Sequence, residues 1–338
     1  MNLEELNGIA RKMVAKGKGL LAADESTGTI AKRFDAIKVQ NTEDNRRDYR
    51  ELLFRAMDAM NKHISGVILF DETIRQKAKD GTSMVKLIQE SGAIPGIKVD
   101  AGAKPLAGEP GQTVTEGLDG LRERFQEYHK LGARFAKWRA TYDPTKPSYN
   151  CINANGQALA RYAALAQENG IVPIVEPEVL MDYDNDIDAC EAITEWVLKE
   201  TFAQLYYAKV ALEGIILKPN MVISGKKCGK QASVEDVAER TVKVLKRCVP
   251  GAVPGIAFLS GGQSDEEATA HLNAMNAANP NLPWALTFSY GRALQAAPQK
   301  AWSGKVDNVK AAQAAFEHRA NMNGLAAQGK WKKELEKA

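Results

Sequence analysis

The feature that most constrains the fold is a regular alternation of short apolar runs with segments of helical pattern. The chain of 338 residues contains eight such runs, at residues 19–26, 64–72, 93–100, 135–141, 171–179, 214–221, 255–262 and 284–291. Most of them are apolar throughout instead of at every second residue, which is typical of a parallel sheet covered on both faces. Eight parallel strands close a barrel, so we predict an α/β fold, a single (β/α)8 TIM barrel.

Helical spacing of apolar residues predicts the segments that cover the barrel. These helices are expected at residues 42–61, 82–91, 118–132, 155–170, 190–212, 234–249 and 265–278, with extra N- and C-terminal helices at 1–19 and 307–328. An open doubly wound sheet is the alternative, but the turn after the first run has no GxGxxG pattern. No domain boundary is visible, so we expect residues 1–338 to form one domain that ends in a short solvated tail at about 330–338.

Composition excludes several classes of partner. Lys plus Arg number 45 and Asp plus Glu 42, and this net charge of +3 gives no general attraction to nucleic acid or to a membrane surface. No apolar run is long enough to cross a membrane, and residues 1–19 do not have the pattern of a signal peptide. The four cysteines form no CxxC pair, which favours reduced thiols and a cytoplasmic protein.

The histidines do not predict a metal site. They are scattered and show no HExxH or paired ligand spacing; they are His63, His129, His271 and His318. The glycine- and lysine-rich loop SGKKCGK at 224–230 has charges that attract anions, but we expect it to be an ordinary solvated loop. We therefore predict a protein without metal or cofactor.

Ionisable or hydroxyl groups end or follow seven of the eight runs. They are Asp24, Lys98, Lys137, Arg139, Glu176, Glu178, Lys218, Ser260 and Arg292. Polar residues are expected wherever a strand meets solvent, but several of these follow apolar residues inside the run itself. Because the carboxyl ends of all strands of such a barrel lie on one face, we expect these groups to meet at one rim. Side chains two residues apart on a strand share a side, so Lys137 lies with Arg139, and Glu176 with Glu178.

Lys218 is the candidate nucleophile of that rim. It ends the run GIILKPNM, and Pro219 after it removes a backbone donor, which is tolerable only at a strand end. A partly desolvated lysine near other cations loses its proton near neutral pH and attacks a carbonyl group. Lowering its pKa by ~3 units from about 10.4 takes roughly 4 kcal/mol, and we expect Lys137 and Arg139 to contribute to that shift.

Three carboxylates are candidates for the proton transfers. A Schiff base forms only if a carbinolamine loses water, and Glu176 and Glu178 are placed to supply the acid and base steps. Asp24 is suited to taking a proton from a substrate hydroxyl group. Lys218 and these carboxylates together predict Schiff-base chemistry on a carbonyl compound.

Two glycine-containing turns predict a phosphate site. SGGQS follows the seventh run and SYGR follows the eighth, so Ser260, Gly261 and Gly262 lie near Ser289, Gly291 and Arg292. Glycines let backbone N–H groups approach an anion, and arginine adds a bidentate cation. Barrels of this type commonly hold a phosphate group at these two loops.

The motifs LLAADES, GIKVDAG, KWRA, IVEPE, LKPNM, FLSGGQS and SYGRAL occur in this order, and with them the chain resembles class I fructose-bisphosphate aldolase from about residue 5 to about residue 330. The resemblance implies a metal-free enzyme, usually a homotetramer, that cleaves fructose 1,6-bisphosphate to dihydroxyacetone phosphate and glyceraldehyde 3-phosphate in glycolysis and gluconeogenesis.

The resemblance also implies a role for each site residue. Lys218 would form the Schiff base, Glu176 would be the main general acid and base with support from Glu178, and Lys137 would stabilise the carbinolamine. Arg139 would hold nearby phosphate or hydroxyl groups, and Asp24 would position the lysine and handle the C4 hydroxyl. The phosphate next to C1 would lie on the two glycine-containing turns, and the candidates for the phosphate at C6 are Ser26, Arg33 and Lys98.

One departure from the family concerns the C-terminus. Many animal members end in a tyrosine that assists proton exchange on the enamine, whereas no tyrosine follows Tyr290 here. Another group or water is expected to take that step. Two other readings remain open, namely a different Schiff-base aldolase or transaldolase acting on another ketose phosphate, and a barrel kept as a binding or scaffold protein. The intact set of acids, base and lysine favours catalysis.

Overall fold

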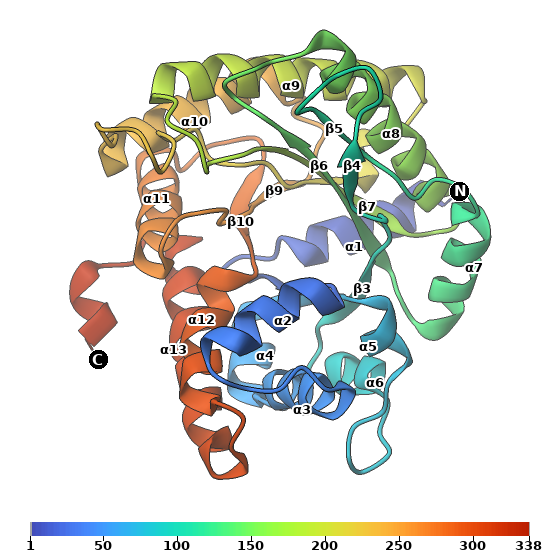
Figure 1. Cartoon of the computed structure of the whole chain (residues 1–338), viewed down its shortest axis with the longest axis vertical. Coiled ribbons are helices and arrows are strands. Elements are labelled where there is room, and N and C mark those ends of the chain that lie inside the picture. The colour runs from blue at the N-terminus through green and yellow to red at the C-terminus, as the bar shows by residue number, and fades with distance from the viewer. Residues whose placement is uncertain (1, 338) are drawn as a thin grey trace.

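The computed structural model describes residues 2–337, and its eight parallel strands close into a barrel, which confirms the predicted fold (Figure 1). The strands are β1 (Gly19–Ala23), β2 (Ile64–Leu69), β3 (Ile94–Lys98), β6 (Phe135–Tyr142), β7 (Val172–Val179), β8 (Ile216–Leu217), β9 (Gly255–Phe258) and β10 (Ala285–Tyr290). They neighbour one another in chain order, and β10 pairs with β1 to close the ring.

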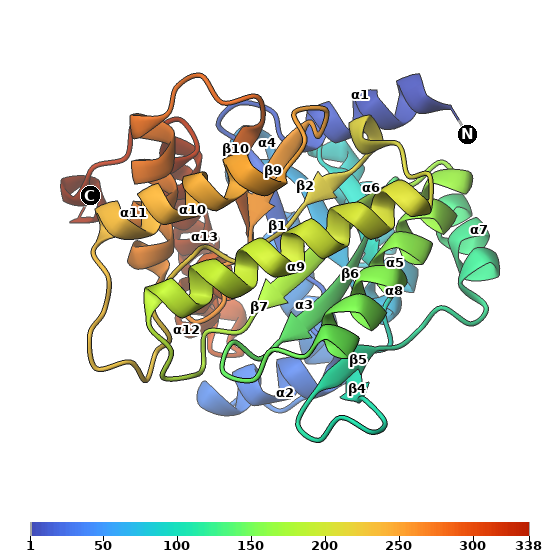
Figure 2. The same ribbon diagram turned by 90° about the horizontal axis from the view of Figure 1, so that it is seen from above.

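Helices surround this barrel on the outside (Figure 2). They are α1 (Leu3–Met13), α2 (Thr27–Ala36), α3 (Glu43–Phe54), α4 (Met57–His63), α5 (Asp71–Arg75), α6 (Met84–Glu90), α7 (Leu121–Leu131), α8 (Tyr149–Glu168), α9 (Ile187–Tyr207), α10 (Val234–Cys248), α11 (Asp265–Ala278), α12 (Arg292–Trp302) and α13 (Val309–Ala326). None of the helices described is both long enough and apolar enough to span a bilayer.

Several elements differ from the predicted ones. Residues expected to be a linker form α2, since Ser26 caps the first turn by accepting from the backbone N–H of Thr29. The helix expected at 42–61 is broken at Ala56 into α3 and α4. The helix α12 was not predicted, because Pro298 inside it disguises the helical pattern. A small antiparallel pair, β4 (Ala103–Pro105) and β5 (Thr113–Thr115), occupies the Gly- and Pro-rich stretch after β3.

The strand β8 is shorter than the run that predicted it. Residues Leu212–Gly214 form a 3-10 turn, and only Ile216–Leu217 are in the sheet. The chain stays in register after β8 because the Lys218 N–H donates to the Val175 carbonyl at 2.8 Å and the Pro219 carbonyl accepts from the Leu259 N–H at 3.2 Å. Proline therefore costs no hydrogen bond where it stands.

The interior of the barrel changes from apolar to ionic along the strands. At the amino ends, side chains such as Leu20, Phe135, Ile174 and Ile216 pack against Leu6, Ala10 and Met13 of α1, which closes that end. Two residues further along the same faces come the charged groups, because side chains alternate between the two faces of a strand. Phe135 is followed by Lys137, Ile174 by Glu176, and Ile216 by Lys218. The strand pattern thus places the ionic groups above a packed apolar layer.

The ring of Phe135 needs two glycines beside it. A Cβ at Gly96 would lie 2.2 Å from Phe135 Cε2, and one at Gly66 would lie 2.9 Å from Phe135 Cε1. Real Cβ atoms do not come this close, so both positions accept only glycine while the ring stays in place. The ring of Phe135 fills the space that side chains at the two glycine positions would otherwise take, and so completes the layer below the charged groups.

The C-terminal segment is anchored, contrary to the solvated tail that we predicted. After α13, the Glu336 carboxylate accepts from Trp331 Nε1 at 2.9 Å and pairs with the guanidinium of Arg319. Arg319 is buried, with 4% of its surface exposed. The tail docks because this buried guanidinium on α13 needs a carboxylate, and Glu336 provides it.

Candidate functional site

Four predicted residues form a continuous chain of charges inside the carboxyl end of the barrel. Lys218 Nζ lies 3.2 Å from Glu176 Oε1, Lys137 Nζ lies 3.3 Å from Glu176 Oε2, and Lys137 Nζ lies 2.7 Å from Asp24 Oδ2. The side chains come from four strands or strand ends, at β8, β7, β6 and β1. One carboxylate therefore lies between two amines, which is the geometry that the strand alternation predicts.

All four residues of this chain of charges are buried. The exposed fractions are 8% for Asp24, 5% for Lys137 and 3% for both Glu176 and Lys218. Buried charges are stable only when they are paired, and each of these groups contacts an opposite charge. The site is therefore polar and largely shielded from bulk solvent.

The pairing fixes the charge of two of these residues. Burial alone would raise the pKa of Asp24, but the positive charges of Lys137 and Lys218 outweigh burial and lower that pKa to about 2. Burial would lower the pKa of Lys137, but the negative charges of Asp24 and Glu176 outweigh it and raise that pKa above its ordinary value. This shift favours the ammonium form of Lys137, and Lys218, at the end of its apolar run, remains the candidate amine of this chain of charges.

Glu178 and Arg139 form a second pair at the rim. Arg139 Nε donates to Glu178 Oε2, and Glu178 is buried while the Arg139 side chain is 40% exposed. Burial would lower the pKa of Arg139, but the negative charge of Glu178 outweighs burial and raises it. The guanidinium therefore faces the opening of the barrel and remains charged, as expected of a group that holds phosphate or hydroxyl oxygens.

Asp100 belongs to the site, although sequence reasoning missed it. Its Oδ1 accepts from Lys98 Nζ at 2.7 Å, and its Oδ2 accepts from the backbone N–H of Arg139 at 3.3 Å. It stands two residues after Lys98 in GIKVDAG, so the alternation argument applied to the other strands would have found it. The contact with Asp100 thus fixes the direction of the Lys98 side chain, and Lys98 lies beside β6.

The two glycine-containing turns lie at the ends of β9 and β10, as predicted. Gly261 has a left-handed backbone with φ of +50°, and its carbonyl accepts from the Arg292 guanidinium. Ser260 and Ser289 are buried, with exposed fractions of 5% and 1%. The Ser289 hydroxyl is buried without a hydrogen-bond partner within residues 2–337. A buried polar atom of this kind is unusual, and a ligand oxygen would satisfy it.

Arg33 lies against the second of these turns. A Cβ at Gly291 would be 3.5 Å from a terminal nitrogen of Arg33, and the Arg33 guanidinium pairs with Glu25. Glu25, also missed from the sequence, is buried and accepts from Gln295 Nε2 at 2.7 Å. Ser26 caps α2 close by in the sequence. The structure therefore brings Arg33 beside Gly291, whereas the motif resemblance implies that it binds the C6 phosphate together with Ser26 and Lys98.

The described residues contain no group of three or more His, Cys, Asp or Glu side chains that could hold a metal ion. His271 is buried on α11, where its Nδ1 lies 2.6 Å from Gln263 Nε2. Burial lowers its pKa to about 4, so the ring is neutral at physiological pH. It is a core residue.

Known proteins resemble this chain over nearly its whole length. The family model described as glycolytic, fructose-bisphosphate aldolase class-I, matches residues 5–338. A probable fructose-bisphosphate aldolase class 1 of Xanthomonas campestris pv. campestris is 59% identical over 335 residues, which are 98% of this chain and 100% of that protein. Fructose-bisphosphate aldolase C of Rattus norvegicus is 54% identical over 330 residues, 97% of this chain and 91% of that protein.

A solved structure has the same fold. The fructose-bisphosphate aldolase of Plasmodium falciparum, in a ternary co-crystal structure with TRAP and a small molecule inhibitor, superposes with a TM-score of 0.94 at 49% sequence identity. The match covers 98% of this chain and 96% of that chain.

Proposed function

The chain belongs to the class I fructose-bisphosphate aldolase family, and we propose that it cleaves fructose 1,6-bisphosphate reversibly to dihydroxyacetone phosphate and glyceraldehyde 3-phosphate through a Schiff base on Lys218. The family membership confirms the resemblance seen in the motifs. The observation that carries the mechanism is the Glu176 carboxylate between two amines, 3.2 Å from Lys218 Nζ and 3.3 Å from Lys137 Nζ.

Formation of the Schiff base begins at Lys218. Its uncharged amine attacks the C2 carbonyl, and Glu176 is within hydrogen-bonding distance to take the ammonium proton beforehand and to return a proton to the leaving hydroxyl. Lys137, held as an ammonium ion, stabilises the oxygen charge of the carbinolamine. Glu178 supports the dehydration from the rim. The resulting iminium accepts the electrons of the C3–C4 bond when that bond breaks.

Asp24 has two tasks in this scheme. With a pKa of about 2 it is a weak base in the resting enzyme, so there it mainly positions Lys137. When the substrate enters, its C4 hydroxyl group competes with Lys137 for contact with Asp24, and with Asp24 for contact with Lys137. Weakening the contact between these two residues makes the carboxylate more basic, and it can then accept the C4 hydroxyl proton as the C3–C4 bond breaks.

The two phosphate groups are proposed to lie on opposite sides of this reaction centre. Ser260, Gly261, Gly262, Ser289, Gly291 and Arg292 hold the phosphate at C1. Ser26, Arg33 and Lys98 contribute to the phosphate at C6, with Arg139 near the hydroxyl groups between. Arg33, which lies beside Gly291, is placed to contact the C1 phosphate as well. The enamine left after cleavage is proposed to take its proton from water or from another group, since no tyrosine follows Tyr290.

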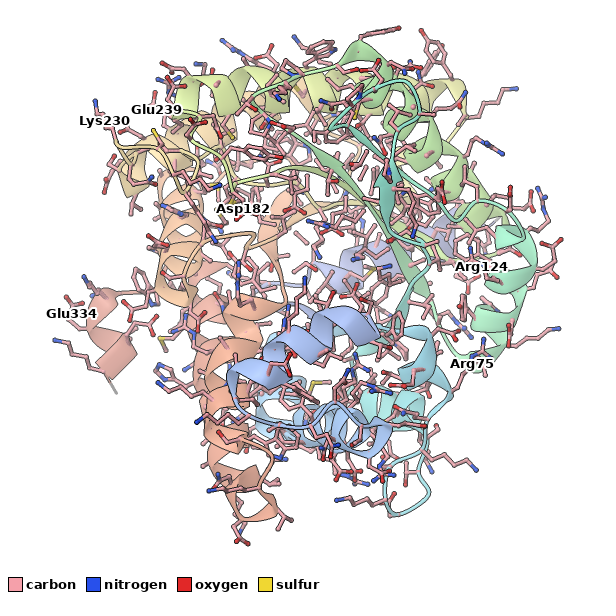
Figure 3. All side chains as sticks on the ribbon, viewed as in Figure 1. Arg75, Arg124, Asp182, Lys230, Glu239 and Glu334 are labelled. Atoms are coloured by element: carbon pink, nitrogen blue, oxygen red, sulfur yellow. The ribbon has the colours of Figure 1, made fainter. Side chains whose placement is uncertain are left out.

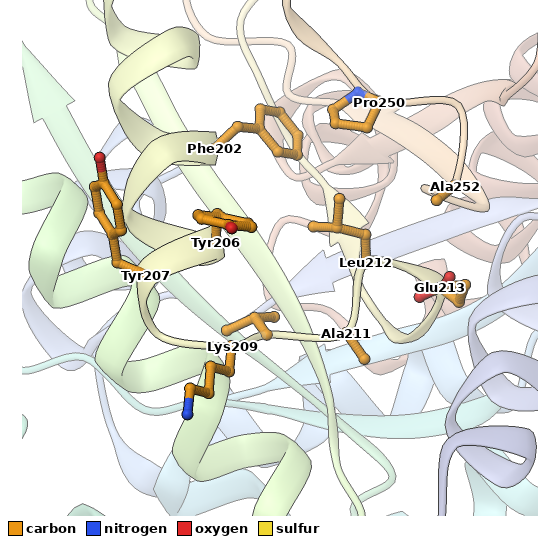
Figure 4. A pocket seen from close by; sticks show the side chains of 10 residues that line it. Phe202, Tyr206, Tyr207, Lys209, Ala211, Leu212, Glu213, Pro250 and Ala252 are labelled. Carbon is orange, nitrogen blue, oxygen red and sulfur yellow. The ribbon is translucent and has the colours of Figure 1, made fainter.

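We further propose one domain over residues 1–338, a metal- and cofactor-free enzyme, and a cytoplasmic location in which the four cysteines, all free here, stay reduced. A homo-oligomer, a tetramer by family resemblance, is supported by an apolar groove of about 640 Å³ at the end of α9. Figure 4 shows that Phe202, Tyr206, Leu212 and Pro250 line it. Tyr206 and its neighbour Tyr207 are 77% and 71% exposed, and a second copy of this chain would cover them.

The proposed function is tested by trapping the Schiff base. Borohydride added with dihydroxyacetone phosphate should inactivate the protein irreversibly, and peptide mapping should find the adduct on Lys218. An adduct on another lysine would refute the assignment. Cleavage of fructose 1,6-bisphosphate compared with fructose 1-phosphate and sedoheptulose bisphosphate separates this reading from another ketose-phosphate aldolase or a transaldolase. Activity should survive EDTA, and a loss restored by zinc would contradict the metal-free mechanism.

A further inference from the structure

The lysine-rich loop after β8 reaches the phosphate turn after β9. A Cβ at Gly262 would lie 1.9 Å from Lys226 Cε and 2.6 Å from Lys226 Nζ. The end of the Lys226 side chain therefore occupies the space directly beside the Gly262 backbone. The sequence predicted only a solvated loop here, and Lys226 is not among the phosphate-binding residues that the family motifs supply.

The backbone around Lys226 is held in place by the segment after β7. The Lys226 N–H donates to the Met181 carbonyl at 2.8 Å, and the Lys227 N–H donates to the Tyr183 carbonyl at 2.9 Å. A Cβ at Gly225 would lie 2.2 Å from the Tyr183 carbonyl oxygen, so this approach requires glycine. The position of the Lys226 main chain is thus set by the fold, and its side chain starts from a fixed point.

The Lys226 ammonium has no strong partner within residues 2–337. It makes no hydrogen bond there, and its nearest carboxylate oxygen is Asp182 Oδ1 at 3.7 Å. The two side chains are 43% and 72% exposed, and an ion pair so long and so exposed contributes little. Figure 3 shows Lys230, at the far end of the loop that contains Lys226, projecting at the edge of the molecule. Asp182 lies nearer the centre of that view. A cation close to the phosphate turn thus remains available to an anion.

Lys226 and Arg292 bring two cations to consecutive residues of one turn. Arg292 donates to the Gly261 carbonyl, and Lys226 lies beside Gly262. The Gly262 N–H donates to Met181 Sδ at 3.4 Å, a weak acceptor that a phosphate oxygen would replace. A phosphate dianion needs this combination of a backbone donor and nearby cations.

We propose that Lys226 is a further phosphate-binding residue, which contacts the C1 phosphate of the ketose phosphate beside Gly262. This inference rests on the proposed function, because that function places the C1 phosphate on the turn. The ammonium acts as a point charge that strengthens binding of the half of the substrate that stays on the enzyme after cleavage. It takes no part in forming or breaking the covalent bond.

The experiment measures the dihydroxyacetone phosphate concentration that gives half-maximal inactivation by borohydride. Lys226→Met keeps the length of the side chain and removes its charge, and this concentration should rise about threefold to tenfold. Lys227→Met, at the adjacent exposed position, is the matched control and should leave the concentration unchanged. Lys226→Arg should recover most of the lost affinity. The salt dependence of half-saturation should be weaker in Lys226→Met than in the wild type.

The outcomes separate this inference from the proposed function. If the wild type is not trapped on Lys218, the proposed function itself fails. If the wild type is trapped and Lys226→Met half-saturates at the same concentration, Lys226 only bridges two loops and the inference is wrong. An equal rise in Lys226→Met and Lys227→Met would mean a diffuse effect of loop charge, which also overturns it. Should Lys226→Met fold poorly by circular dichroism, Lys226→Gln gives the same comparison.

Discussion

Replacing Lys137 by methionine tests whether the chain of charges is energetically coupled. Asp24 has an ordinary pKa of 3.8 and a pKa of about 2 in the folded protein, a difference of roughly 1.8 units. At 1.36 kcal/mol per unit, the ionised carboxylate contributes on the order of 2 kcal/mol to the free energy of unfolding at pH 7. Most of that contribution depends on the ammonium 2.7 Å away.

The sign of the pH dependence follows from the direction of the shift. A carboxylate whose pKa is lowered by folding stabilises the protein above its unfolded pKa, and that contribution is lost as pH falls through the folded pKa. About half of this contribution should therefore remain at pH 3. In the Lys137→Met variant the buried Asp24 loses its main partner, so most of the contribution should be absent at both pH values and the variant should be less stable by about 3 kcal/mol at pH 7.

Urea unfolding of the wild type, Lys137→Met, Asp24→Asn and the double variant gives the coupling energy between the two residues. We expect a coupling on the order of 2 kcal/mol at pH 7 and a clearly smaller one at pH 3. Because Lys137 also contacts Glu176, only the double-mutant cycle isolates Asp24. Additive losses at pH 7, or a coupling that does not change between pH 7 and pH 3, would refute the account of this pair.

Three further predictions concern groups outside the reaction centre. Burial lowers the pKa of His271 from 6.5 to about 4. Because the imidazole is then protonated more readily in the unfolded chain, the free energy of unfolding of the wild type should fall by about 3 kcal/mol between pH 6.5 and pH 4. In urea titrations, His271→Asn should flatten this pH dependence. Glu336→Gln removes the carboxylate that pairs with buried Arg319, so stability should fall by about 1 to 3 kcal/mol and trypsin should cut the tail faster; unchanged cleavage would contradict the docking. Gly96→Ala places a methyl group 2.2 Å from the Phe135 ring, which should cost more than about 3 kcal/mol or prevent soluble expression, and a stable variant would show that the ring moves freely.

The strand pattern was sufficient to predict the charged rim. Alternation within FAKWRAT and IVEPEV placed Lys137, Arg139, Glu176 and Glu178 toward the barrel interior, because the period of a strand leaves no other choice once one face is assigned. Lys218 followed from its position at the end of an apolar run. These residues lie where the sequence predicts because local geometry alone decides which way they point.

Contacts between loops were not predictable in the same way. Glu25 pairs with Arg33, and such a pairing depends on how far each loop extends over the rim. The approach of Lys226 to Gly262 depends on backbone bonds between two loops that are distant in the sequence. The docked Glu336 is a similar case, since nothing near it in the sequence indicates that a buried arginine on α13 lies opposite. Local patterns carry no information on these long-range distances.

The packing of α1 against the amino ends of the strands closes that end of the barrel, so the carboxyl rim is the way in. A molecule that enters at the rim has to leave by the same route, so the two products leave one after the other. Under the proposed mechanism, the aldehyde has no covalent bond to the protein and is expected to depart first, while the ketone half stays attached to Lys218 and keeps a new hexose out until it is released.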